Sequence, residues 1–65
     1  MSSLNTEPNL ADPDDFYAEL LEMLDDKDVK QSREIHARLI LLLSNHIGDR
    51  EILSEAMKIA AKAAG

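Results

Sequence analysis

Apolar residues recur along this chain at helical spacing in three stretches, each bounded by polar residues. The first stretch follows Asp12 and Pro13, which predict a helix start: an aspartate N-cap accepts backbone N–H groups, and proline at the first helical position loses no hydrogen bond. An acidic turn at residues 25–28 is expected to end this helix. Its apolar positions recur at i, i+1, i+4, i+5 and i+8, one helical stripe. They are Phe16, Tyr17, Leu20, Leu21 and Leu24.

The central stretch, residues 29–47, is predicted to be a helix that is apolar over much of its circumference. At about 100° per residue its apolar side chains and two histidines spread over roughly 160°, wider than the roughly 100° stripe of an ordinary surface helix. Asp28 is the expected N-cap, and Gly48 is the expected left-handed residue at the end. Two short flanking helices do not easily cover such a helix, so the pattern indicates a partner.

A third helix is predicted to follow directly, capped by Asp49. Its apolar stripe consists of Ile52, Leu53, Ala56, Met57, Ala60 and Ala63. No β pattern and no internal repeat interrupts the chain. The sequence therefore predicts an all-α fold, an antiparallel three-helix unit with an extended N-terminal arm, associating through the central helix. Residues 1–11 are the predicted arm and residues 12–65 the single three-helix domain.

The small size of the chain strengthens the case for association. Chains of about 60 residues bury only about 60% of their unfolded surface and are marginal alone. Disulfides, a metal or oligomerisation usually stabilise such small domains. This 65-residue chain has no cysteine, which rules out a disulfide framework and a thiolate zinc site. Self-association as a dimer is therefore the expected source of additional stability.

Charge is distributed unevenly along the chain. Of 13 acidic residues nine lie in residues 1–31, against two of the seven basic residues, and the net charge is −6. An acidic front half repels phosphate backbones, so nucleic acid is not an expected partner. The N-terminus has neither the basic region nor the apolar core of a signal peptide, and the longest apolar run, residues 39–43, is far too short to span a membrane. We therefore expect a cytoplasmic protein with no membrane partner.

No pattern in the chain indicates a metal, a cofactor or a catalytic residue. His36 and His46 point about 80° apart on the central helix, so they do not share a metal within one chain. His46 is expected to pack its ring near the core at the helix end. The aspartates of residues 12–15 lack the glycine and distal glutamate of a calcium loop, so helix capping explains them better. No nucleophile stands at a recognisable spacing from a base, and there is no glycine-rich phosphate loop.

The candidate partner-binding residues all lie on the central helix. Arg38 and Asn45 are seven residues apart and line up on one side, with Leu41 between them, which resembles an apolar anchor flanked by polar groups that fix register. The alternative is a solvated face with one stray leucine; Arg38 is also a candidate to pair with an acid of the first helix, Glu19 or Glu22. The full candidate set is Arg38, Leu39, Leu41, Leu42, Leu43, Asn45 and His46.

Two stretches carry a resemblance to a known family: residues 4–17 (LNTEPNLADPDDFY) and residues 37–49 (ARLILLLSNHIGD). Together they resemble a small proteobacterial domain family of unknown function, and the resemblance covers nearly the whole chain. The resemblance implies a short cytoplasmic protein not known as an enzyme, often encoded near flavin-dependent aromatic hydroxylases or other oxidoreductases. It brings no site residues.

Three functions are compatible with these observations. The first is a non-catalytic helical interaction protein that self-associates as a dimer through the central helix. The second, implied by the resemblance, is an accessory subunit or regulator of a larger flavoprotein oxidoreductase, held by the arm and the Arg38–Leu41–Asn45 face. The third is a small-molecule binder in a dimer groove lined by Tyr17, Met23 and Met57, although these residues are more simply core fillers.

Overall fold

The computed structural model describes residues 3–65, and in this range the chain forms three helices and no strand. They are α1 (Pro13–Leu24), α2 (Val29–Ile47) and α3 (Arg50–Ala64), in the positions that the apolar pattern predicts. The all-α fold class is therefore confirmed. The first two residues of the predicted arm lie outside the described range.

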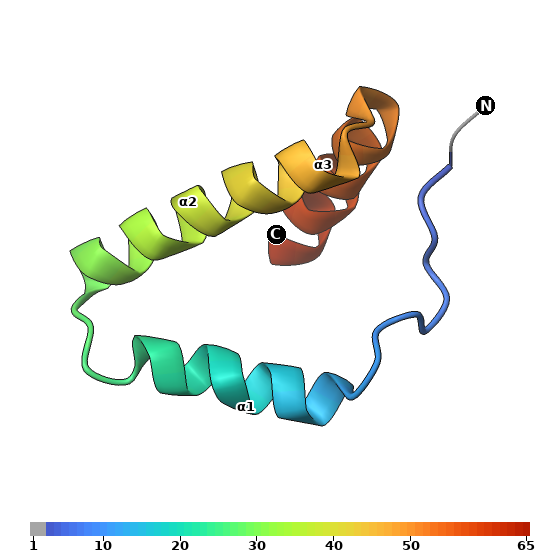
Figure 1. Cartoon of the computed structure of the whole chain (residues 1–65). Helices are drawn as coiled ribbons and strands as arrows, with labels where there is room; N and C mark the ends of the chain where they lie inside the picture. Colours follow the sequence, from blue (N-terminus) through green and yellow to red (C-terminus); the bar gives the residue numbers. More distant parts are fainter. Residues whose placement is uncertain (1–2) are drawn as a thin grey trace.

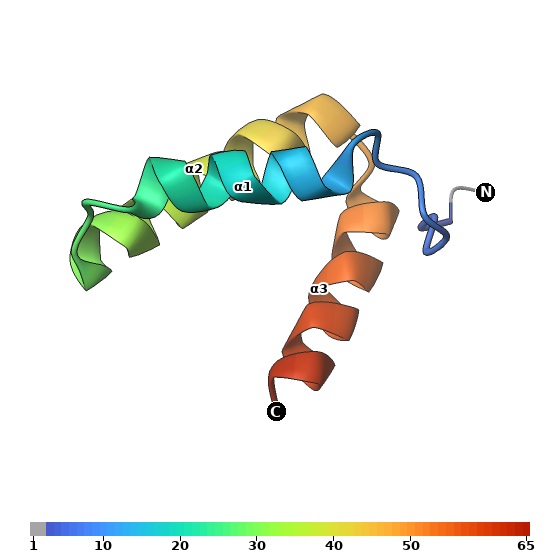
Figure 2. The ribbon, with the colours of Figure 1, turned by 90° about the horizontal axis from the view of Figure 1, so that it is seen from below.

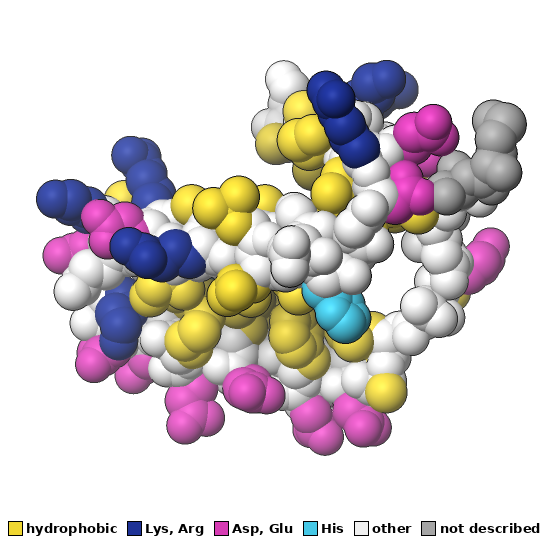
Figure 3. All heavy atoms as spheres, turned by 45° about the horizontal axis from the view of Figure 1, so that its top comes forward, with side chains coloured by type: hydrophobic (Ala, Val, Ile, Leu, Met, Phe, Trp, Pro, Cys, Tyr) yellow, Lys and Arg dark blue, Asp and Glu magenta, His cyan; other side chains and the backbone are white. Residues whose placement is uncertain are grey.

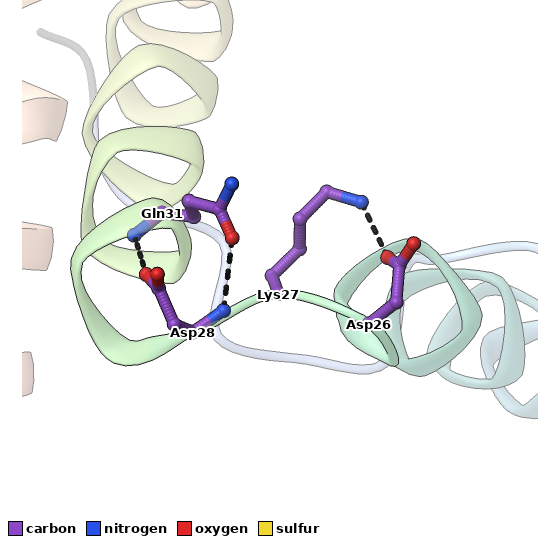
Figure 4. A network of polar contacts seen from close by, with 4 residues as sticks. All are labelled: Asp26, Lys27, Asp28 and Gln31. Atoms are coloured by element: carbon purple, nitrogen blue, oxygen red, sulfur yellow. Dashed lines mark hydrogen bonds and ion pairs between the residues drawn. The ribbon is translucent and has the colours of Figure 1, made fainter.

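The ends of α2 and α3 are built by local polar contacts. Asp28 and Gln31 form a reciprocal capping box at the start of α2: the Gln31 N–H donates to Asp28 Oδ1 (2.8 Å), and the Asp28 N–H donates to Gln31 Oε1 (3.0 Å; Figure 4). Gly48 ends α2 in the left-handed conformation, φ 68°, with its N–H donating to the Ser44 carbonyl. Asp49 Oδ1 accepts the backbone N–H groups of the third helix's first turn.

The predicted capping role of the Asp12 side chain is wrong. A side-chain cap requires an extended backbone at the N-cap residue, and Asp28 (ψ 176°) and Asp49 (ψ 109°) have one. Asp12 instead adopts the left-handed conformation (φ 49°, ψ 57°), and its carboxylate makes no cap hydrogen bond. Only its backbone carbonyl contributes, by accepting the Phe16 N–H at 3.0 Å.

The three helices form an open unit. The chain reverses between α1 and α2, so these helices run antiparallel as a hairpin (Figure 1). Beyond the two-residue connection Gly48–Asp49, α3 turns away from the hairpin and projects from it (Figure 2). The N-terminal arm passes from the start of α1 toward α3, where the Leu4 N–H lies 3.4 Å from Glu55 Oε2.

No described residue is buried. The most protected apolar side chains are only half-buried, and they lie on the sides by which the helices and the arm approach one another: Leu4, Leu20, Leu24, Ile35, Leu39, Ile52, Leu53 and Ala56. Tyr17, expected to have its ring in a core, is 60% exposed. The chain by itself therefore has an apolar seam where a globular domain has a core.

Candidate protein-interaction surface

The candidate residues of α2 divide between two environments. Leu39 is half-buried and lines a hollow between α1 and α2 together with Phe16, Leu20 and Met23. Leu41 and Leu42 are each 70% exposed, and Leu43 is 50% exposed. Leu39 thus belongs to the contact between α1 and α2. Leu41, Leu42 and Leu43 are left exposed and are open to a partner.

The structure brings Arg38, Leu41 and Asn45 together as the sequence predicts. With Leu42 they line one open hollow of about 410 Å³ on the outer side of α2. Within the described residues Arg38 forms no ion pair with Glu19 or Glu22, the alternative that the sequence left open. Its guanidinium therefore stays available to this hollow, which we call the outer face.

The two histidines both lie on the exposed surface of α2. Both side chains are exposed, so the expectation that His46 packs its ring near the core is wrong; the hairpin diverges near this end of α2 and leaves no core there (Figure 1). Among residues 3–65 no three potential ligands from His, Asp or Glu are gathered closely enough to hold a metal ion.

A second hollow lies between α2 and α3, and sequence reasoning missed it. This α2–α3 groove, of about 460 Å³, is predominantly apolar. Its lining residues are Ile40, Ser44, Arg50, Leu53, Ser54, Ala56, Met57 and Ala60. The apolar stripe of the third helix was visible in the sequence, but the meeting of Ile40 with that stripe depends on the direction in which α3 leaves Gly48.

The total accessible surface is large for a chain of this size. A compact monomer of 7.2 kDa has an accessible surface of about 4,100 Å², whereas this chain exposes 6133 Å². Its radius of gyration is 13.5 Å, against about 11 Å for a compact 65-residue domain. Figure 3 shows part of the excess as a row of hydrophobic side chains between α2 and the acidic edge of α1.

The turn between α1 and α2 carries a local pair of opposite charges. The ion pair among the described residues joins Lys27 Nζ to Asp26 Oδ1 at 2.5 Å in the α1–α2 turn (Figure 4). The hydrogen bond from Lys27, reinforced by its positive charge, lowers the pKa of the Asp26 carboxyl. Asp26 is fully exposed there, so the pair is solvated.

Comparison with known sequences places the chain in a family. Residues 4–62 match the sequence profile of a family described as protein of unknown function (DUF2783), and the chain belongs to that family. No curated protein and no solved structure matches it significantly. In the described residues no helix has both the length and the apolar character needed to cross a membrane.

Proposed function

We propose that this protein is a small, non-catalytic, cytoplasmic interaction protein that self-associates as a dimer. One observation carries the proposal: the chain exposes about 2,000 Å² more surface than a compact monomer of its mass. A standard protein–protein interface removes about 800 Å² from each partner. The excess is therefore larger than the area that such an interface removes from one chain.

The exposed leucines of α2 supply the energy for this association. Each Å² of apolar surface removed from water contributes about 25 cal/mol, so covering these side chains offsets the entropy lost when two chains associate. Leu43 lies about 40° around α2 from Leu39, next to the hairpin seam, whereas Leu41 lies about 160° from Leu39 on the outer face. We assign self-association to the Leu43 side and leave the outer face open.

Sedimentation equilibrium over a roughly hundredfold range of protein concentration tests the proposal. The wild-type chain is expected to sediment as a dimer. Leu43→Glu is expected to dissociate it, because burying an unpaired carboxylate costs several kcal/mol, whereas Leu41→Glu retains the dimer mass. A wild-type monomer would contradict the proposal, as would a folded Leu43→Glu chain of unchanged mass.

A second candidate function rests on the outer face. The hollow lined by Arg38, Leu41, Leu42 and Asn45 has the composition of an interface edge. It supports an accessory role on a larger protein, for which a flavin-dependent oxidoreductase, the class of gene neighbour that the family resemblance implies, is the first bait. Co-expression with that bait, with flavin absorbance followed through gel filtration, is the test. We expect the chain to comigrate with the flavoprotein, less so at higher salt, and not to comigrate in the Leu41→Glu variant. Comigration that Leu41→Glu does not change would contradict this role of the outer face.

A further inference from the structure

The corner between the hairpin and α3 is predominantly apolar on both of its walls. On α2, Leu39 points toward α1 and Ile40 and Ser44 line the α2–α3 groove. Leu43 and Ile47 lie between these two directions, at about 100° per residue, and are 50% and 49% exposed. The corner therefore continues the groove with large apolar side chains that the described part of the chain leaves half exposed.

The third helix has an apolar stripe that is only partly covered. Its first turns are half-buried at Ile52, Leu53 and Ala56. Farther along, Met57 is 64% exposed and Ile59 48% exposed, and Figure 2 shows this half of α3 standing clear of the hairpin. An amphipathic helix with an open stripe thus projects from an apolar corner that lacks a helix.

The chain's own α3 is directed away from that corner by its connection to α2. Gly48 is left-handed and donates its N–H to the Ser44 carbonyl at 2.9 Å. Asp49 Oδ1 accepts the N–H groups of Glu51 and Ile52 at 3.0 and 3.2 Å. These bonds leave no slack residue between the helices, so the chain's own α3 does not fold back over the corner.

Charge and exposed surface favour a second copy as the molecule that covers the corner. Residues 1–31 carry nine acids and two lysines, so two α1 helices repel one another, whereas residues 49–65 carry three acids and three bases and approach a second copy without net repulsion. The excess of about 2,000 Å² over a compact monomer also exceeds the roughly 800 Å² that one partner contributes to a standard interface. A second copy therefore meets no net repulsion at α3 and finds enough exposed surface to contact.

We propose that α3 of a second copy lies in the α2–α3 groove, reciprocally, so that the two α3 helices cross near Ala60 about a two-fold axis. This inference rests on the proposed dimer and specifies its interface. An isologous contact of this kind closes on itself and forms dimers rather than filaments. Ala60 lines the groove, whereas Ala61 does not line it and lies about 100° farther around the helix.

These adjacent alanines provide a matched pair for the test. Ala60→Glu is expected to raise the dimer dissociation constant by at least about 100-fold, because its carboxylate is buried in an apolar groove. Ala61→Glu adds the same charge to the same helix and is expected to change it by less than about threefold. Sedimentation equilibrium gives both constants, and circular dichroism at the same concentrations reports whether the helices are retained.

Cysteine accessibility tests the same interface without a new charge. The chain has no native cysteine, so Ala60→Cys and Ala61→Cys each carry one thiol. We expect a bulky maleimide to label the residue-60 thiol more slowly as the dimer forms, and the residue-61 thiol at one rate throughout. A dimer in which both glutamate variants keep their mass, or both thiols react alike, would overturn this interface but not self-association. A monomeric wild-type chain would overturn both.

Discussion

The α1–α2 hairpin and α3 present similar apolar stripes, but the chain uses them differently. In the hairpin, Leu20 and Leu39 line one hollow from opposite helices and are half-buried there. In α3 the stripe is half-buried near the connection to α2 and is exposed beyond it, at Met57, Ala60 and Ala63. The hairpin has an internal partner because a four-residue turn lets its helices run antiparallel, whereas the two-residue Gly48–Asp49 connection sends α3 outward.

The largest expected effect comes from shortening side chains on the two sides of this comparison. Leu39→Ala should lower the free energy of unfolding by about 2 kcal/mol, at the low end for leucine truncations because the side chain is half-buried. This loss should be the same at every protein concentration. Met57→Ala should have little effect in dilute solution and a growing effect as the chain associates. Urea unfolding at two concentrations measures both, and equal concentration dependence of the two variants would contradict the comparison.

The next largest effect is expected at Gly48, in the connection between the hairpin and α3. Gly48→Ala should destabilise the chain by about 1–2 kcal/mol, because φ 68° is a left-handed conformation that an L side chain adopts at that cost. Space is not the reason, since a Cβ atom there would lie 3.7 Å from the Asn45 carbonyl oxygen. Thermal unfolding followed by circular dichroism measures the change. Gly48→Asn, which tolerates this conformation better, should recover part of the stability.

The helix caps give a smaller and more local contrast. Asp28→Ala removes the capping box of α2 and should lower the free energy of unfolding by about 1 kcal/mol. Asp12→Ala removes a carboxylate that makes no cap hydrogen bond and should change stability far less. Urea unfolding of the two variants is the measurement. Similar losses in both would mean that the Asp12 carboxylate caps α1 after all.

The smallest expected effect is electrostatic. Lys27→Met should raise the pKa of Asp26 toward the ordinary aspartate value, as followed by NMR titration of its carboxyl carbon, with no measurable loss of stability because the pair is solvated. The sign of the pH effect follows from linkage. A carboxyl whose pKa is lower in the folded state stabilises the fold at pH values above its ordinary, unfolded-state pKa. That contribution is lost as the pH falls through the folded-state pKa. An unchanged Asp26 pKa in the variant would exclude Lys27 as the cause.

The sequence predicted the local features of α2 correctly. The bounds of α2, its cap at Asp28 and its end at Gly48 follow from groups a few residues apart, and the structure confirms them. The gathering of Arg38, Leu41 and Asn45 in one hollow follows from helical periodicity within a single helix. The binding role of that outer face remains a prediction, because periodicity places side chains on a face without naming what covers it.

The sequence by itself determined where the helices begin and end and which side of each is apolar, because these properties depend on neighbours within one or two turns. Only the tertiary structure decided that Asp12 is left-handed, that Leu39 faces α1, and that Ile40 meets the stripe of α3 in a groove. The physical reason is that the direction of a chain after a turn, and hence which apolar faces meet, depends on backbone angles and long-range packing that no local pattern encodes.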